Sequence, residues 1–86
     1  MREIKLLYFA SVREAIGIAE ETRILPEDVH TPAAIAKWLS ASGPGYAAAL
    51  AEIGKLRFAA DQEVVAHDAP LGGAFEIAIF PPVTGG

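Results

Sequence analysis

Apolar and polar side chains alternate in several short stretches of the chain, with the period of a β-strand. In residues 3–9, Ile4, Leu6 and Tyr8 share one face, which we assign to the core. Residues 20–25 alternate in the same way. Three further strands are predicted, over residues 55–60, 63–66 and 76–80.

The main helix is predicted to begin at Thr31 and to end before Gly43. Thr31 provides a hydroxyl cap and is followed by a proline at the first helical position, which together are a strong start signal. Ile35, Trp38 and Leu39 recur at helical spacing and are assigned to the core face.

Two shorter helices are predicted on either side of the main helix. Ser11 and Glu14 have the spacing of a capping box, which indicates a short helix over residues 11–16. Gly17 follows as a helix stop. An alanine-rich stretch predicts the second short helix, over residues 46–53.

The order of these elements is strand, short helix, strand, helix, short helix and three strands. The first two strands are joined by too few residues for a parallel crossover, so we expect them to be antiparallel. This order predicts an α+β domain, in which one main helix packs on one face of a mixed sheet of about five strands. Residues 1–80 are expected to form the domain, and residues 81–86 an extended tail.

Composition and charge exclude several classes of function. The chain has 86 residues, 52% of them hydrophobic and 21% charged, which is typical of one small soluble domain. Its net charge of −4 disfavours nucleic acid and anionic membranes as partners. Cysteine is absent, which excludes disulfides and thiolate chemistry. No apolar run is long enough to span a membrane, and we expect a cytoplasmic protein.

No group of residues has the pattern of an active site or a metal site. His30 and His67 lack the spacing of metal ligands. Residues 72–73 are two glycines without the strand and helix that surround a phosphate-binding loop. The adjacent carboxylates Glu20 and Glu21 are interpreted as a solvated strand edge. We therefore expect no metal, no bound cofactor and no catalytic apparatus in this chain alone.

The last seven residues, Phe80-Pro-Pro-Val-Thr-Gly-Gly86, are distinctive, and residues 81–86 of this motif form the tail. Pro81 and Pro82 favour an extended polyproline conformation, which projects the chain outward. Gly85 and Gly86 have no side chains, so a terminal carboxylate could enter a narrow channel. The tail spans on the order of 20 Å, which would place that carboxylate deep inside another protein.

With these features the chain resembles the family of small, sulfur-carrying subunits of molybdopterin synthase, which are ubiquitin-like (β-grasp) proteins. The resemblance covers residues 4–86, and its most specific elements are Tyr8-Phe-Ala-Ser-Val-Arg-Glu14 and the tail itself. Asp61-Gln-Glu also looks like the turn after the family's third strand. Ala74-Phe75 departs from the pattern, because family members commonly carry a Gly-Asp-like polar turn there.

The resemblance implies a chemical role for Gly86. An E1-like adenylating enzyme would use Mg-ATP to convert its carboxylate to an acyl-adenylate, and a sulfur donor protein would then provide the sulfur of a thiocarboxylate. That sulfur would attack a cyclic pyranopterin monophosphate in the large subunit of the synthase, to build the molybdopterin dithiolene. Two carriers and two large subunits would form a heterotetramer. The chain would be the sulfur-donating subunit of a sulfurtransferase.

A surface for binding the large subunit is expected around the start of the tail. Phe9 and Phe80 fall on the strand faces opposite the core residues, and exposed aromatic residues beside a functional tail indicate a binding surface. By resemblance, Val64 joins them. The tail adds further partner-binding residues, Pro81, Pro82, Val83 and Thr84, before the reactive Gly85 and Gly86.

Three other functions remain open on the sequence. The sulfur carrier of thiamine thiazole synthesis shares the fold and the di-glycine end, although Phe80-Pro-Pro-Val argues against it. A ubiquitin-like modifier would use the same activation chemistry but become attached to lysines of other proteins. A β-grasp interaction module would have the same domain and an inert tail.

Overall fold

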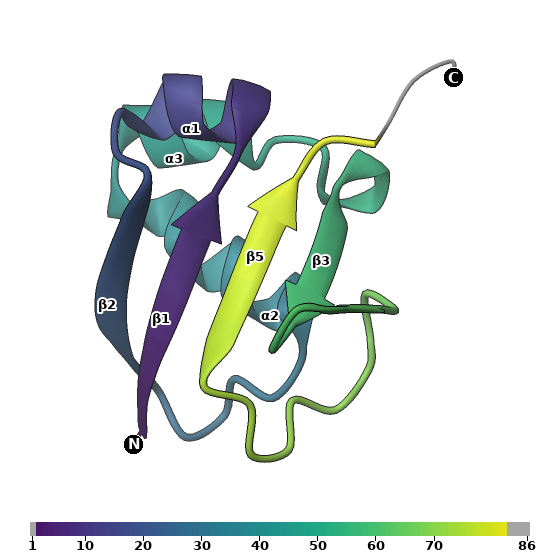
Figure 1. The fold of residues 1–86 in the computed structure, drawn as a ribbon. Coiled ribbons are helices and arrows are strands. Elements are labelled where there is room, and N and C mark those ends of the chain that lie inside the picture. Colours follow the sequence, from purple (N-terminus) through teal and green to yellow (C-terminus); the bar gives the residue numbers. More distant parts are fainter. Residues whose placement is uncertain (1, 83–86) are drawn as a thin grey trace.

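A five-stranded mixed sheet forms the central layer of the protein. The computed structural model describes residues 2–82, in which the strand order is β2-β1-β5-β3-β4 (Figure 1). β1 and β5 are parallel, and the other neighbouring pairs are antiparallel. The predicted α+β class, the mixed sheet and the antiparallel first pair are confirmed. The strands are β1 (Arg2–Tyr8), β2 (Glu20–Leu25), β3 (Arg57–Ala60), β4 (Glu63–Val65) and β5 (Glu76–Phe80).

The helices lie on one face of this sheet. Figure 1 shows α2 crossing behind the strands, while α1 and α3 lie together near the carboxyl end of β1. No helix of residues 2–82 covers the opposite face, which we call the open face (Figure 1). The helices are α1 (Ala10–Ile16), α2 (Pro32–Leu39) and α3 (Pro44–Ala49), with 3₁₀ turns η1 (Ser40–Ser42) and η2 (Ile53–Lys55).

The core lies between the sheet and α2. The side chains of Ile4, Leu6 and Tyr8 are buried against the helices, as their alternation predicts. Ile35 and Leu39 of α2 are buried opposite them, whereas the predicted core residue Trp38 is only partly buried. The remaining large members of the core are Leu25, Leu50, Leu56, Phe58, Leu71, Ile77 and Ile79.

The two predicted helix starts have different outcomes. Thr31 Oγ1 accepts a 3.1 Å hydrogen bond from the Ala34 backbone N–H, which confirms the cap of α2. The capping box at Ser11 is wrong, because α1 begins at Ala10 and its N-cap is Phe9, without a side-chain cap. Phe9 N–H instead donates to Ile79 O at 3.2 Å, so pairing with β5 determines where the strand ends and the helix begins.

The second short helix is shorter than predicted and begins earlier. It was expected over residues 46–53, but α3 covers Pro44–Ala49. Leu50 has non-helical dihedrals (φ −110°, ψ 17°) and is only 2% exposed. The chain leaves the helix there, and Leu50 packs in the core. The 3₁₀ turn η2 follows, so β3 begins at Arg57 and not at residue 55.

The turn between β3 and β4 has a conformation suited to a tight hairpin. Asp61 and Gln62 both have positive φ, 47° and 72°, as two-residue hairpin turns of type I′ require. Asp61 Oδ1 accepts hydrogen bonds from the backbone N–H groups of Phe75 (2.9 Å) and Glu76 (3.0 Å). The turn is thereby attached to the beginning of β5.

Candidate functional site: the start of the tail and the open face of the sheet

The chain leaves the sheet at the carboxyl end of β5. Because β1 and β5 are parallel, this end lies beside the carboxyl end of β1 (Figure 1). Phe80 is the last residue of β5, and the half-buried Pro81 and Pro82 follow it. The other predicted tail residues, Val83, Thr84, Gly85 and Gly86, lie outside the described residues. The division into a domain of residues 1–80 and a tail of 81–86 therefore stays a prediction.

An apolar row crosses the open face next to the start of the tail. In the strand register, Leu7 pairs with Ala78, Ala78 pairs with Ala59, and Ala59 pairs with Val64. These four side chains face away from the helices, because their neighbours along the strands face the core. Val64 is 69% exposed, at the β4 end of the row.

The two predicted aromatic residues lie beside this row. Phe80 is on the open face and half-buried, outside the core. Phe9 lies just beyond β1 and is 49% exposed. Its backbone hydrogen bond to Ile79 keeps it beside β5. The structure thus places Phe9, Val64 and Phe80 around one apolar surface, which we call the docking face: Leu7, Phe9, Ala59, Val64, Ala78 and Phe80.

A polar cluster lies on the helix side of β2, which the sequence did not predict. Glu21 is not a solvated edge residue, because its carboxylate accepts hydrogen bonds from the hydroxyls of Tyr8 (2.6 Å) and Tyr46 (2.7 Å). Arg23 lies 3.4 Å from the same carboxylate. The apolar Ile24 of the same strand faces the other way, and its side chain is 52% exposed on the open face. The alternation of β2 was visible in the sequence, but its orientation was not.

Hydrogen bonding determines the ionisation of this cluster. Partial burial would raise the pKa of Glu21, but the hydrogen bonds from Tyr8, Tyr46 and Arg23 outweigh burial and lower it. Burial, and then the hydrogen bond to ionised Glu21, raise the pKa of both tyrosines. Glu21 is therefore ionised at neutral pH with its acceptor oxygens occupied, which suits a structural role and not acid–base catalysis.

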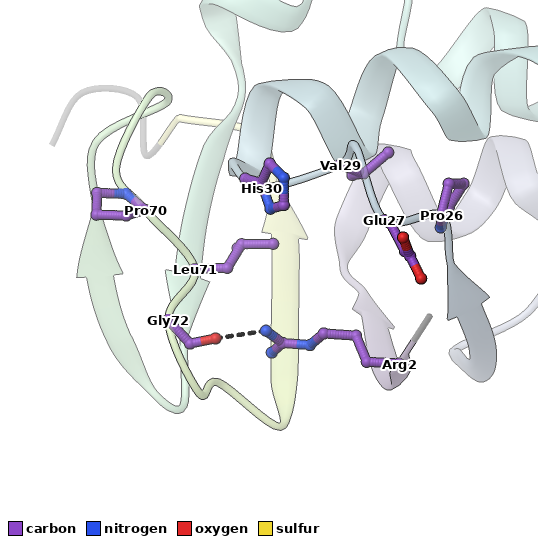
Figure 2. A pocket seen from close by; sticks show the side chains of 8 residues that line it. All are labelled: Arg2, Pro26, Glu27, Val29, His30, Pro70, Leu71 and Gly72. Atoms are coloured by element: carbon purple, nitrogen blue, oxygen red, sulfur yellow. Dashed lines mark hydrogen bonds between the residues drawn. The ribbon is translucent and has the colours of Figure 1, made fainter.

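An open hollow of about 510 Å³ lies at the opposite end of the sheet from the tail. Figure 2 shows that Arg2, from the beginning of β1, reaches toward Gly72 across this hollow. The Arg2 guanidinium donates to the backbone carbonyls of Gly72 and Ala74, so it joins β1 to the loop before β5. His30 also lines the hollow, where the other described lining residues include no serine, threonine, cysteine or second histidine.

The other histidine, His67, makes contacts within the fold. His67 Nε2 is 2.7 Å from Leu56 O, and the ring packs edge-on against Phe58. In residues 2–82, no three His, Cys, Asp or Glu side chains are grouped so that they could hold a metal ion. Within the same residues, no helix is long and apolar enough to cross a membrane. The docking face and the tail beside it are thus the candidate functional site.

The sheet is mixed, its strand order is β2-β1-β5-β3-β4, and one main helix crosses one of its faces. Together with a last strand that leads into the tail, this arrangement defines a ubiquitin-like β-grasp protein. The ThiS family model matches residues 6–86, so the chain belongs to the ThiS family. Among solved structures, SAMP1 from Haloferax volcanii has a TM-score of 0.72 at 21% identity, covering 99% of this chain and 100% of that one. The β-grasp fold expected from the sequence is confirmed.

Curated relatives match over almost their whole length. The molybdopterin synthase sulfur carrier subunit of Escherichia coli is 43% identical, over 96% of this chain and 99% of the relative. The protein of the same name from Haemophilus influenzae is 39% identical over the same fractions. The family resemblance seen in the sequence is therefore confirmed.

Proposed function

We propose that this protein is the sulfur-carrier subunit of a molybdopterin synthase. The observation that carries the proposal is the 43% identity to the Escherichia coli carrier subunit across 99% of that protein. A third relative with the same name, from Chlamydomonas reinhardtii, is 37% identical over 99% of its length. The family match extends to Gly86, so the di-glycine end belongs to the matched segment.

In this proposal, the carboxylate of Gly86 is the reacting group. A carboxylate is a poor acyl donor because its leaving group would be oxide. An E1-like adenylating enzyme therefore first uses Mg-ATP to form an acyl-adenylate at Gly86. Sulfur from a donor protein then replaces AMP, which leaves a thiocarboxylate that is a good nucleophile at neutral pH. Its sulfur attacks the cyclic pyranopterin monophosphate held by the large subunit, and hydrolysis of the resulting thioester leaves the sulfur on the pterin and returns the Gly86 carboxylate. Two such transfers, from two charged carriers, supply the two sulfurs of the dithiolene.

The contribution of this chain is to carry and position the sulfur. β5 pairs with β1 on one side and β3 on the other, so the direction in which the tail leaves is determined by two neighbouring strands. Pro81 and Pro82 restrict the backbone that follows. Accurate placement of a nucleophile removes a large part of the entropic barrier to reaction. The acid–base and phosphate-binding groups belong to the large subunit.

The docking face is the proposed contact with the large subunit. It combines aromatic and aliphatic side chains, Phe9, Phe80 and Val64, around two alanines at its centre. Apolar residues with aromatic members are typical of the centre of protein interfaces. Two carriers and two large subunits would form the heterotetramer. The cytoplasmic location expected from the sequence stays a prediction.

The decisive experiment measures the intact mass of the chain after co-expression with an E1-like adenylating enzyme and a sulfur source. We expect a mass increase equal to the replacement of one oxygen by sulfur, and no increase in a variant lacking Gly86. The thiocarboxylated protein, mixed with large subunit and precursor, should yield molybdopterin. An unchanged mass would favour an inert interaction module, and lysine-linked conjugates would favour a protein modifier. Transfer of sulfur only to a thiazole precursor would assign the chain to thiamine synthesis.

A further inference from the structure

Arg57 is a positively charged residue that pairs across the strands with the residue just before the tail. It is the first residue of β3 and pairs directly with Phe80, the last residue of β5. Its neighbour Phe58 faces the core, so the Arg57 side chain is on the open face with Phe80. Directly paired residues in antiparallel strands have Cβ atoms about 4.5–5.5 Å apart. The Arg57 side chain therefore begins at the rim of the docking face.

Lys5, which is also on the open face, has residues of opposite charge beside it, in contrast to Arg57. Lys5 is 3.1 Å from Glu20, and Glu76 is the register partner of Lys5 on β5. Arg57 makes no ion pair or hydrogen bond through its side chain within residues 2–82. Toward the tail, its neighbours on this face are apolar.

We infer that Arg57 is a specificity-determining residue of this carrier, which pairs with a carboxylate on the large subunit of the synthase. The inference rests on the proposed function, because it takes the docking face as the contact with that subunit. A partner that covers Phe80 also covers its cross-strand neighbour Arg57. Loss of water around an unpaired charge is unfavourable, and a carboxylate of the partner at that point offsets it.

The position of this pair gives it a role in orientation. Apolar contacts around Phe80, Val64 and Phe9 are non-directional. A planar guanidinium binds a carboxylate through two parallel hydrogen bonds, which determines the relative orientation of the two groups. At the start of the tail, that orientation selects the direction in which residues after Pro82 enter the partner. An acidic chain of net charge −4 would otherwise repel an acidic surface at this position.

The test uses the full-length carrier and its cognate large subunit, with dissociation constants measured by titration calorimetry. The variants are Arg57→Leu, Arg57→Glu and Arg57→Lys. Lys37, an exposed residue of α2 on the helix side, provides the matched controls Lys37→Leu and Lys37→Glu. Thermal unfolding of each variant and its thiocarboxylation by the adenylating enzyme are measured in parallel.

We expect Arg57→Leu to weaken binding at least about tenfold and Arg57→Glu further, with Arg57→Lys between Leu and wild type. The Lys37 variants should bind like wild type. A single Asp or Glu to Arg change on the large subunit should restore binding of Arg57→Glu. Wild-type affinity in both Arg57→Leu and Arg57→Glu would overturn the inference, while binding of the wild-type chain would still support the proposed function. Failure of the wild-type chain to bind the large subunit would overturn both.

Discussion

The Tyr8 hydroxyl donates a 2.6 Å hydrogen bond to Oε2 of Glu21, and Tyr46 donates to the same oxygen at 2.7 Å. Tyr8 ends β1, Glu21 is in β2 and Tyr46 is in α3, so one carboxylate connects three elements. The Arg23 guanidinium lies 5.0 Å from the centre of the Trp38 ring and 2.8 Å from Ser42 Oγ. These contacts attach the edge strand β2 to the helical layer.

Lowering the pH should weaken the attachment of β2 to the helical layer through Glu21. The pKa of Glu21 is lowered in the folded protein, so its contribution to stability is present above the ordinary value of 4.5 and is lost as the pH falls through the folded pKa. We expect the free energy of unfolding to decrease below about pH 4.5, measured by urea denaturation at a series of pH values. Glu21→Gln should remove this part of the decrease. Glu20→Gln, at an exposed neighbouring carboxylate, is the control and should leave it unchanged.

The Tyr8 hydroxyl should contribute measurably to stability. Tyr8→Phe keeps the buried ring and removes one donor to an ionised carboxylate, which we expect to lower the free energy of unfolding by about 1.5–3 kcal/mol. In the background of Glu21→Gln the same substitution should have a smaller effect. Equal effects in the two backgrounds, in a double-mutant cycle, would show that the two side chains are not coupled.

The close approach of α1 and α3 depends on Gly45. A Cβ at this position would lie 2.5 Å from Ala15 O, which is backbone and cannot move independently. We expect Gly45→Ala to lower the free energy of unfolding by about 1–3 kcal/mol. Gly54→Ala is the matched control, because a Cβ there meets nothing within 4 Å. An unchanged free energy of unfolding in Gly45→Ala would mean that α1 and α3 can move apart with little loss of stability.

A substitution at Phe80 should affect binding at the docking face without affecting folding of the core. Phe80→Ala should weaken binding of the large subunit by about 1–3 kcal/mol while the free chain stays folded, because Phe80 lies on the open face. Binding is measured by calorimetry and folding by circular dichroism. Phe75→Ala, at an 81% exposed phenylalanine before β5, is the control and should bind normally. Unfolding of Phe80→Ala without a specific binding defect would assign this side chain to the core.

The length of the tail should be critical for sulfur transfer. Deleting Gly86 moves the terminal carboxyl back by about 3.3–3.6 Å, and a misplacement of about 1 Å can already lower a rate about a hundredfold. We expect no product from this variant, or from one extended by a residue, in a turnover assay with large subunit and precursor. Gly85→Ala should affect binding less but impair adenylation, because its Cβ crowds the activating site. Circular dichroism should show wild-type folding in all three variants.

Normal product formation by the variant without Gly86 would falsify the carrier mechanism. That result would leave the β-grasp fold and the family membership untouched, because both rest on the whole chain.

Most elements of the fold could be predicted because their signals are local. Ile4, Leu6 and Tyr8 alternate with polar or exposed neighbours, and the strand they predict is present with its core face as expected. Thr31 caps α2 as predicted, since its hydroxyl and the proline after it act within one turn. The predicted turn at Asp61-Gln62 is present, and Asp61 is of a residue type that tolerates positive φ.

Local rules failed where distant parts of the chain compete for the same backbone. The capping box at Ser11 is not formed, because Phe9 remains paired with β5 until α1 begins. The helix predicted over residues 46–53 ends early, because Leu50 is needed in the core. The interpretation of Glu21 as solvated is wrong, because two tyrosines distant in sequence donate hydrogen bonds to its carboxylate and no local pattern reveals them.

The order of the elements, the fold class and the di-glycine tail can be read from the amino-acid sequence alone, because each depends on neighbouring residues or on a contiguous motif. Which residues lie side by side across strands is known only from the folded structure. The pairing of Arg57 with Phe80, and the row of Leu7, Ala78 and Ala59, depend on strand register. Register is determined by packing of the whole sheet on its helices, and a shift of one residue would exchange the two faces of a strand.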